Sequence, residues 1–529
     1  MYLSSITDWW KYISTLCLVI VVTIVYCFCV STFKKWKELN VPYSKPIPLF
    51  GNILNQVLGK VHAVEFYNKL YYEFTGHRYG VVFQMRTPYL MIRDPELIND
   101  VLIKDFLSFT DRGVYSDYKV NPLSNNLLFM KNPQWRTMRN KITPAFTPAK
   151  LKLMYGQIKE CGDKLMKNIN KYLKKKNNEI EIRDVIGKYS IDIVSTCIFG
   201  FELTDKESVF HECGKLMFTP TLKTLFGQMI LMTDLTLFNI VRLKDFPTEV
   251  TDLFHSTLKD TITYREENKI IRNDFLQILM KTRRDLVLKT NLPDHEKFTE
   301  TQIIANAFGI FTAGFETVSS TICYCLYELA LNKDIQDKVR QEVQLKLSNN
   351  DGKFNNEFLL DLHYLDMVIA ETLRMYPPVI ALYRTTTQTY RVPNDSVMIE
   401  KGQKIVIPVY ALHYDEQYYT DPKKFIPERF SAGENAKRPT GIYLPFGDGP
   451  RICLGILLNE KLICHKCKYF LNFLGKRFAE MEMKLAIAEM LTKFELCPCE
   501  KTEIPLKYSN VFFTLVPKSG IWLKFKKIN

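Results

Sequence analysis

One glycine-rich loop carries a cysteine whose neighbours leave few folds open to this chain. It begins the stretch FGDGPRICLGILLNEKLICHKC, residues 446–467. Two kinds of metal site compete for it: zinc bound by Cys453, Cys464, His465 and Cys467, or iron bound by the Cys453 thiolate alone. Structural zinc sites pair two short knuckles, whereas here only Cys464 and Cys467 form one, and His465 directly follows Cys464. The spacing therefore favours iron with a single thiolate ligand.

The residues before Cys453 suit a thiolate that binds iron beneath a planar cofactor. Such a sulfur needs positive charge and backbone donors nearby, and the chain needs glycine where it runs flat against the cofactor. The loop resembles the haem-binding loop of the cytochrome P-450 family, FxxGxRxCxG, with every fixed position filled: Phe446, Gly449, Arg451, Cys453 and Gly455. On this loop alone, a glycine-rich surface turn that happens to contain cysteine stays open as an alternative.

An uncharged apolar run, residues 13–30, is long enough to cross a bilayer as a helix. Lys34, Lys35 and Lys37 follow it, so the positive-inside rule places the bulk of the chain on the cytoplasmic side. A cleavable signal peptide is the alternative, but the cationic flank lies behind the run. We therefore expect a membrane anchor at 1–33 and a proline-containing hinge at 34–52.

The rest of the chain, 53–529, has the size of one large enzyme domain, and no segment in it is typical of a linker. Thirteen scattered cysteines do not form a secreted disulfide framework. The charge of +14 suits anionic lipid or an acidic partner, and the dispersed basic residues do not favour nucleic acid. Helical periodicity at 149–173, 252–285, 301–347 and 476–491, with strand-like segments at 79–94, 386–409 and 509–525, predicts a mainly α fold with a minor β region.

A second motif, AFGIFTAGFETVSST at 307–321, lies within a predicted long helix. Ala313 and Gly314 would let a cofactor or substrate come close to the backbone. A threonine hydroxyl at Thr317 can bond to the carbonyl one turn back and bend the helix, and Glu316 can relay protons. Close packing between two helices is an alternative explanation for the small residues Ala313 and Gly314. The segment is similar to the oxygen-activating AGxET motif of the family.

A third motif, ETLRMYPP at 371–378, sets Glu371 and Arg374 on one helix face. Such a pair is most often a weak surface ion pair, but the apolar residues around it indicate a buried helix. Arg429 of PERF, 427–430, is a further candidate partner for Glu371. The set resembles the ExxR and PERF network that holds the haem-binding core in the family.

QWRTMRNKITPAF, residues 134–146, places Trp135 and Arg139 about one helical turn apart. An amphipathic helix with an aromatic anchor is the simpler interpretation. In the family, residues of this kind meet a haem propionate, and Arg384 and Arg451 would reach the propionates as well, because guanidinium forks match carboxylates.

These motifs occur together and in the order of the family, so the chain is identified as a haem-thiolate monooxygenase of the cytochrome P-450 family. The wording of TPAFTPAK, RNDFLQILM and FGDGPRICLG resembles insect microsomal members that oxidise xenobiotics. The resemblance implies haem b with Cys453 as axial ligand, a cytoplasmic domain on the endoplasmic reticulum, a lipophilic substrate, and electrons from an NADPH-cytochrome P-450 reductase, with cytochrome b5 as a further candidate partner. No GxGxxG nucleotide loop is evident.

Two other function classes stay open at this point. A haem-thiolate isomerase or dehydratase would need no oxygen activation and could dispense with Glu316 and Thr317. A zinc-binding membrane protein rests only on Cys464, His465 and Cys467. The segments 108–130, 215–242, 379–382 and 511–515 are candidate walls of a lipophilic pocket.

The segment 456–475, ILLNEKLICHKCKYFLNFLG, interrupts the passage from the loop to the next helix. Deleting it would restore FGDGPRICLGKRFAEMEMKLA. Its composition, rich in residues with A/T-rich codons, is typical of a short intron read through in frame, and a genuine surface insertion is the alternative. A product inactivated by the 456–475 insertion stays open as an alternative function.

Overall fold

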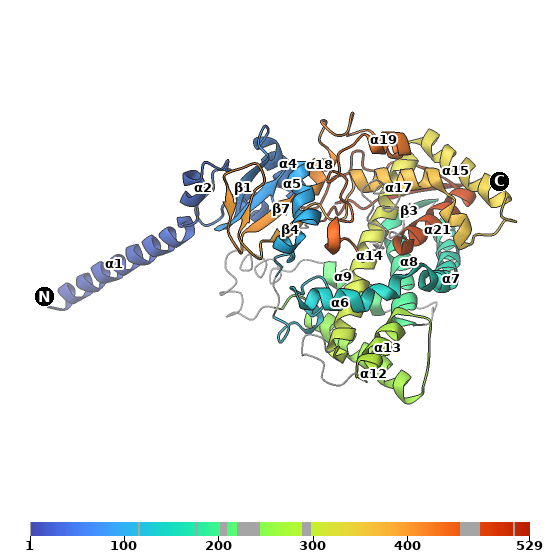
Figure 1. The fold of residues 1–529 in the computed structure, drawn as a ribbon, viewed down its shortest axis with the longest axis horizontal. Coiled ribbons are helices and arrows are strands. Elements are labelled where there is room, and N and C mark those ends of the chain that lie inside the picture. The colour runs from blue at the N-terminus through green and yellow to red at the C-terminus, as the bar shows by residue number, and fades with distance from the viewer. Residues whose placement is uncertain are drawn as a thin grey trace.

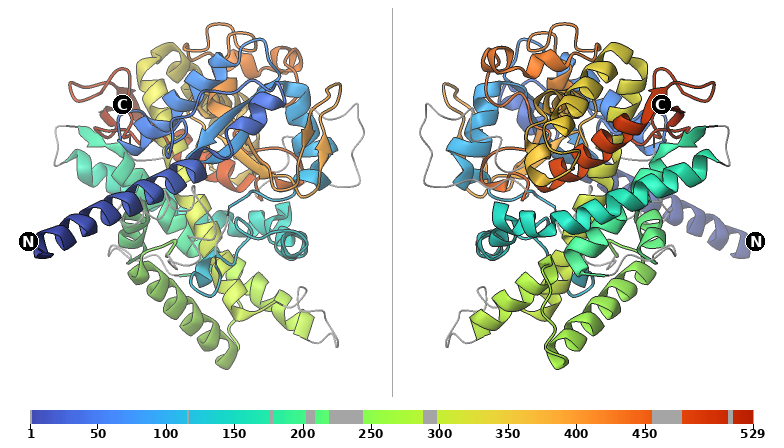
Figure 2. Two further views of the ribbon diagram at one scale, coloured as in Figure 1. Left: turned by 90° about the vertical axis from the view of Figure 1, so that its left-hand side faces the viewer. Right: turned by 90° about the vertical axis from the view of Figure 1, so that its right-hand side faces the viewer.

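A computed structural model of the chain describes residues 2–114, 117–174, 178–201, 209–218, 244–287, 298–454, 477–510 and 514–528. Helix α1 (Tyr2–Val30) projects beyond the outline of the body in Figures 1 and 2. Within the described residues it is the one helix long and apolar enough to cross a membrane, over Tyr12–Val30 with a mean hydropathy of 2.7. The apolar run predicted from the sequence is therefore a helix with solvent-facing apolar side chains.

A small sheet forms the end of the body next to α1. Its strands are β1 (Tyr79–Gln84), β2 (Thr87–Ile92), β7 (Lys404–Ile407) and β4 (Leu382–Thr385), in the order β1-β2-β7-β4. β1 and β2 pair antiparallel, while β2 and β7 pair parallel. The paired strands β2 and β7 are more than 300 residues apart in the sequence. Their pairing therefore depends on the tertiary structure.

The predicted strand-like segment 79–94 forms the β1–β2 hairpin. The chain reverses at Met85 and Arg86, because Gln84 pairs with Thr87. Met85 has the positive φ (55°) that a tight reversal demands. Pro88 precedes the residues that pair with β7, so its missing N–H costs no bond to that strand.

Most of the remaining body is helical. The longer helices are α4 (Ala63–Glu73), α6 (Gln134–Ile142), α7 (Pro148–Leu173), α8 (Ile182–Phe199), α9 (Val209–Phe218), α12 (Thr248–Glu267), α13 (Phe275–Val287), α14 (Glu300–Leu331), α15 (Lys333–Ser348), α17 (His363–Met375) and α21 (Arg477–Lys493). Figure 1 shows α14 in the middle of the molecule, between the sheet and the helical half.

Two of the segments with helical periodicity each contain two helices. The segment 252–285 breaks after Glu267, where Lys269 takes a positive φ (54°) and Asp274 then accepts a hydrogen bond from the Gln277 amide to begin α13. The segment 301–347 breaks at Asn332, whose non-helical backbone ends α14.

Short elements complete the fold. The short helices are α2 (Lys34–Glu38), α3 (Leu54–Val57), α5 (Pro95–Asn99), α16 (Asn356–Leu360), α18 (Val409–His413) and α19 (Ala432–Ala436). Short 3₁₀ and π turns lie at Asp100–Lys104 (η1), Phe106–Phe109 (η2), Pro122–Ser124 (η3), Thr143–Phe146 (η4), Pro427–Phe430 (η6) and Gly449–Arg451 (η7). Strands β3 (Glu179–Glu181), β9 (Trp522–Lys527) and β8 (Phe494–Cys497) pair in that order, and β5 (Tyr390–Arg391) pairs with β6 (Met398–Ile399). The predicted mainly α fold with a minor β region is confirmed.

Helix α14 positions the candidate site because it is buried along most of its length. Thr299 and Gln302 form a capping box at its start, which satisfies two amides that a helix terminus leaves unpaired. It packs against α8, α17 and α21. The segment 477–493 therefore lies against the core as the predicted helix, while 456–475 falls outside the described residues.

Candidate active site

The loop before Cys453 is folded back on itself. The Cys453 amide donates to the Phe446 carbonyl (3.0 Å), and Asp448 accepts from the Gly449 amide (2.7 Å). Gly449 has a φ of +72°, and a Cβ there would lie 1.7 Å from the Leu102 carbonyl oxygen. Only glycine fits this approach, which presses the loop against η1 and leaves Cys453 exposed.

Arg451 is fully buried and ties the loop to the segment 110–130. Its guanidinium donates to the carbonyls of Thr110 (2.6 Å) and Met130 (2.8 Å) and lies 4.2 Å from the centre of the Trp135 ring. The sequence placed Arg451 and Trp135 at a propionate. The structure brings the two side chains into contact with each other, and their place at a propionate stays a prediction.

Three further arginines lie close to Arg451 and the cysteine loop. Arg139 points an Nη2 at the Cys453 carbonyl (3.5 Å), and the Nη2 of Arg112 donates to the Arg451 carbonyl (3.2 Å). Arg384, on β4, is 3% exposed, and its Nε has no hydrogen-bond partner among the described residues. The sequence analysis did not identify Arg112, because the residues around it form no recognisable motif and are typical of an exposed loop.

The four arginine guanidiniums lie close together and have few carboxylates near them. Burial, followed by the charges of Arg112 and Arg384, lowers the pKa of Arg451 to about 8. Burial and then Arg112 lower the pKa of Arg384 to about 9. Burial likewise lowers the pKa of Arg139 to about 10, with the nearby Cys453 acting in the opposite direction. Within the described part of the chain, the carboxylate that reaches the cluster is Asp111, 3.7 Å from the Arg451 Nη2.

A haem fits this cluster. Its two propionates would bring carboxylates to buried guanidiniums that lack them, and Arg384 has a buried Nε without a partner. Charge-assisted pairs of guanidinium and carboxylate are among the strong hydrogen bonds of proteins. The donor set therefore suits a flat dianion lying beside an exposed cysteine. Gly455, the last position of the loop motif, lies outside the described residues.

The second motif divides between two faces of α14. Ala313 is exposed, and the Thr317 hydroxyl donates to its carbonyl (2.6 Å), which is the bond to the preceding turn that the sequence predicted. Gly314 faces α8, since a Cβ there would lie 3.2 Å from the Val194 Cγ2. The absence of a side chain at Gly314 therefore allows α14 to pack closely against α8. The side chain of Ala313, by contrast, is exposed.

Glu316 points to α8 and is nearly buried. Its Oε1 accepts from the Arg183 guanidinium (3.2 Å) and from the Ser320 hydroxyl (3.1 Å). Burial raises the pKa of Glu316, and both Arg183 and Ser320 oppose that rise. Glu316 and Thr317 thus have different partners, and the structure does not join them in one hydrogen bond.

Glu371, Arg374 and Arg429 are brought together. The fully buried Glu371 binds Arg374 through two hydrogen bonds (2.7 and 2.8 Å), and its Oε1 also accepts from the Ile426 amide (3.0 Å) and from Arg429 (3.3 Å). Burial of such a pair is tolerated because every acceptor is satisfied.

His413 links this network to the cysteine loop, a role that the sequence did not indicate. Arg374 donates to the His413 carbonyl (2.8 Å), and His413 Nδ1 donates to the Arg374 carbonyl (3.0 Å). Its Nε2 accepts from the Leu444 amide (3.0 Å), two residues before Phe446. A single neutral tautomer satisfies both ring nitrogens.

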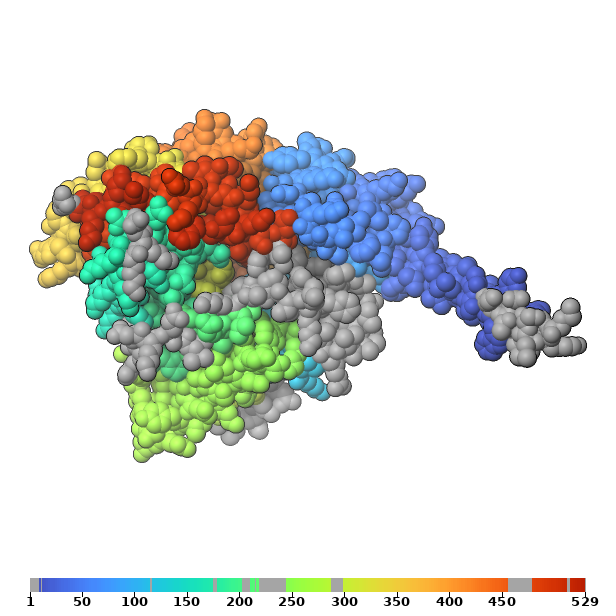
Figure 3. All heavy atoms as spheres, turned by 180° about the vertical axis from the view of Figure 1, so that it is seen from behind, coloured from blue at the N-terminus to red at the C-terminus, as the bar shows by residue number. Residues whose placement is uncertain are grey.

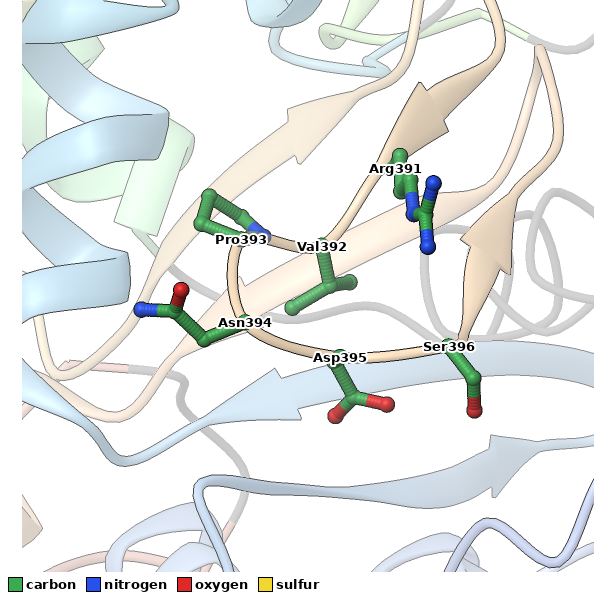
Figure 4. A pocket seen from close by; sticks show the side chains of 6 residues that line it. All are labelled: Arg391, Val392, Pro393, Asn394, Asp395 and Ser396. Carbon is green, nitrogen blue, oxygen red and sulfur yellow. The ribbon is translucent and has the colours of Figure 1, made fainter.

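The chain offers two other candidate sites, a pocket and a possible zinc site. The pocket in Figure 4 is lined by the β5–β6 turn, Arg391–Ser396, away from the cysteine loop, and the Asp395 carboxylate there is taken by the Tyr79 hydroxyl (2.5 Å). No group of three side chains that could bind zinc occurs among the described residues. Cys464, His465 and Cys467 lie outside them.

Comparison with known proteins agrees with the geometry. The sequence model of the family described as Cytochrome P450 matches residues 41–461 and 472–525. Among curated relatives, Probable cytochrome P450 6a13 of Drosophila melanogaster is 35% identical (93% of this chain and 94% of that protein). Cytochrome P450 6k1 of Blattella germanica is 34% identical (96% and 97%). The chain therefore belongs to the cytochrome P450 family of monooxygenases, whose members bind haem iron through a cysteine thiolate.

Proposed function

We propose that this protein inserts one atom of O2 into a lipophilic substrate, with Cys453 as the axial ligand of the haem iron. The observation that carries the proposal is the exposed Cys453 at the end of a backbone-locked loop, beside buried guanidiniums short of carboxylates. When bound, the haem supplies the oxygen-activating chemistry, and a thiolate ligand favours cleavage of the O–O bond.

The arginines take the role of cofactor ligands in this proposal. Arg384, Arg139 and Arg112 would bind the propionates, and Arg451 with Trp135 would complete this set. Arg451 also holds the loop to the segment 110–130 through the carbonyls of Thr110 and Met130. The Glu371 network and His413 hold the loop from its other side. Each group acts from a different element, so the site forms only when the whole core is packed.

On α14, Thr317 holds the Ala313 carbonyl and keeps the helix open toward the substrate side. Glu316 exchanges protons with solvent while its carboxylate stays paired with Arg183. Electrons come from NADPH through a separate flavoprotein reductase, with cytochrome b5 as a further candidate donor. The enzyme works on the cytoplasmic face of the endoplasmic reticulum, and its substrates are lipophilic xenobiotics.

Two measurements test the proposal. Cys453→Ser is expected to lose the absorption band that marks thiolate ligation in the reduced carbonyl complex, whereas the matched control Cys497→Ser, a partly exposed cysteine on β8, retains it. Metal analysis of the purified chain is expected to find iron with porphyrin. A Cys453→Ser variant that keeps the band, or stoichiometric zinc without haem, would refute the assignment.

We also propose that 456–475 is an insertion absent from the working enzyme, retained from an unspliced intron. The family match supports this, because the gap between its two matched stretches, 462–471, falls inside the segment. Transcript sequencing across codons 450–480 is expected to reveal a shorter message. Full-length messages alone, together with a haem-loaded full-length protein, would establish the segment as native.

A further inference from the structure

A group of tyrosines extends from the middle of α14 to the surface, and no step of the proposed function uses it. Thr317, Tyr324 and Glu328 follow one another at intervals of seven and four residues, so they lie on one face of the helix. Tyr324 is two turns, about 10 Å, beyond Thr317. Its side chain is 2% exposed. Tyr324 therefore lies inside the core, on the stripe of α14 that starts at Thr317.

Tyr376, at the C-terminal end of α17, stacks on Tyr324. The two ring centroids are 4.4 Å apart, and the rings are within 4° of parallel. The Tyr376 hydroxyl donates to the Glu328 carboxylate, whose other oxygen accepts from the Asn332 amide group (3.1 Å). Burial raises the pKa of Glu328, and the hydrogen bonds from Tyr376 and Asn332 oppose that rise. A phenol that is stacked on Tyr324 thus lies within proton-transfer reach of a carboxylate.

Tyr508, in the C-terminal segment, continues the group toward the surface, where its side chain is partly exposed. Burial, followed by Tyr324 and Tyr410, raises the pKa of Tyr508. Burial, Glu328 and then Tyr508 raise the pKa of Tyr376. Charge interactions of this kind weaken with distance, so the Tyr508 ring lies near both rings of the stacked pair. Figure 3 shows the C-terminal residues (red) on the surface, next to the N-terminal part of the body (blue).

Hydrogen bonds from α14 hold the C-terminal segment in place beside the stacked pair. The Tyr324 hydroxyl donates to the Leu515 carbonyl, and the Tyr327 hydroxyl donates to the Glu503 carbonyl (3.0 Å). Tyr508 lies between these two bonded residues in the sequence. Its position relative to the pair is therefore fixed from both sides.

The arrangement suits one-electron chemistry better than packing alone. A phenol is among the few side chains that lose one electron to a strong oxidant, and this oxidation requires a base that takes the hydroxyl proton. Tyr376 has such a base in Glu328, and neighbouring rings allow an electron to pass from one phenol to the next. A core that needed only packing would be served by phenylalanine at 376, without the cost of a buried carboxyl group at 328.

We propose that Tyr324, Tyr376 and Tyr508 conduct oxidising equivalents from the haem to the protein surface when no substrate is bound, with Glu328 as the base for the phenolic proton. The inference rests on the proposed haem site at Cys453. Its oxidant is a haem that a hydroperoxide has oxidised, and its final reductant is a small thiol in solution. The path protects the residues around the haem from oxidation.

Electrons and protons balance at each step. Tyr376 loses one electron, through Tyr324, to the oxidised haem, and its proton passes to Glu328. An electron from Tyr508 then reduces the Tyr376 radical, the proton returns from Glu328, and the Tyr508 proton leaves to solvent. A thiol gives a hydrogen atom to the Tyr508 radical, and two thiyl radicals formed in this way join as a disulfide. Overall, one hydroperoxide and two thiols give one alcohol, one water and one disulfide.

The test mixes the haem-loaded full-length chain, without substrate, with an organic hydroperoxide and freezes it for electron paramagnetic resonance. Ring-deuterated tyrosine changes the hyperfine pattern of a tyrosyl radical and so identifies its signal. Tyr376→Phe keeps the stacked ring and is expected to lower the tyrosyl signal several-fold. Glu328→Gln keeps an acceptor for the Tyr376 hydroxyl but cannot take its proton, and is expected to lower the signal to a similar extent.

Tyr79→Phe is the matched control. Tyr79 is also a buried tyrosine whose hydroxyl donates to a carboxylate, that of Asp395 (2.5 Å), but it lies on β1. This variant is expected to keep the full tyrosyl signal.

The surface end of the path has its own readout. Tyr508→Phe leaves the stacked pair intact, so the buried radical should still form. Consumption of thiol by the hydroperoxide-treated protein is expected to fall several-fold in Tyr508→Phe and in Tyr376→Phe. Bleaching of the haem absorbance in the presence of thiol should become several-fold faster in both variants, because the oxidising equivalents stay near the haem.

Three outcomes would overturn the inference. One is an unchanged tyrosyl signal in Tyr376→Phe and Glu328→Gln, and another is an equal loss of signal in Tyr79→Phe. A parent protein that has the thiolate carbonyl band but forms no tyrosyl radical would overturn the inference and leave the proposed function intact. A parent protein without that band would overturn the proposed function first, and the electron path with it.

Discussion

The Arg183 guanidinium lies 3.2 Å from the Glu316 carboxylate and links the start of α8 to the middle of α14. Ser320, one turn along α14, donates to the same carboxylate oxygen. Glu316, the acid proposed to exchange protons, is thus bound by a residue of the neighbouring helix α8. The Thr317 hydroxyl has a different partner, the Ala313 carbonyl. Its protonation depends on a residue more than 130 positions away in the sequence.

Arg183→Ala is expected to shift the pH dependence of turnover. The Arg183 charge opposes the rise in the pKa of Glu316 that burial causes, so its loss raises that pKa further. The limb of the pH profile that reports Glu316 should move to higher pH, and Arg183→Lys should restore it. Product formation per NADPH consumed, followed across a pH series, measures this. A uniform loss of activity at every pH, with an unmoved limb, would indicate a merely structural role.

Arg384→Ala is expected to weaken retention of haem by at least about tenfold, because a hydrogen bond to a charged group contributes about 1.5–3 kcal/mol. Arg391→Ala is the matched control, since Arg391 is an exposed arginine on β5. Transfer of haem to an apoprotein acceptor measures the rate of loss. Equal rates in the two variants would exclude Arg384 from the cofactor site.

Glu371→Gln is expected to destabilise the protein by about 3–5 kcal/mol, because it leaves Arg374 buried without its counter-charge. Glu434→Gln removes an exposed ion pair with Lys437 (2.5 Å) and should change stability by no more than about 0.5 kcal/mol. Denaturant unfolding of both variants measures the difference. Similar losses of unfolding free energy in the two variants would show that the buried Glu371–Arg374 pair does not stabilise the core.

The buried His413 should make stability fall on acidification. Burial, with the nearby charges of Arg374 and Arg438, lowers the pKa of His413 to about 3 from an ordinary value of 6.5. Because the folded pKa is the lower one, this contribution is complete above pH 6.5 and is lost as the pH falls towards 3, by about 1.4 kcal/mol per pH unit. The other groups that face the ring are Tyr419 and Tyr443, whose pKa values are raised, so they stay neutral throughout this range.

Unfolding free energies at a series of pH values, for the parent and for His413→Gln, measure this contribution. The variant keeps a neutral donor and acceptor and should lack this part of the acid slope. His363→Gln replaces a histidine whose side chain is 74% exposed and should leave the slope unchanged. Identical slopes in parent and His413→Gln would place the acid sensitivity in other groups.

Features that depend on neighbours in the chain could be predicted from the sequence. Glu371 and Arg374 share a face wherever a helix forms, because the helical period alone decides it. Gly449 permits the positive φ of the cysteine loop, and the uncharged run at 13–30 can only bury its backbone polar groups by forming a helix in lipid. The family, the mainly α fold and the haem-thiolate chemistry followed from such local patterns.

Contacts between distant segments were decided by the tertiary structure. Arg112 joins the cluster near Cys453, Glu316 turns to Arg183, and His413 receives the Leu444 amide only because the packed core brings their elements together. Trp135 and Arg451, each expected to bind the cofactor, meet each other. A side chain can satisfy its charge or hydrogen bonds with many partners, and the sequence does not say which will be near, because that depends on how every helix in between is packed.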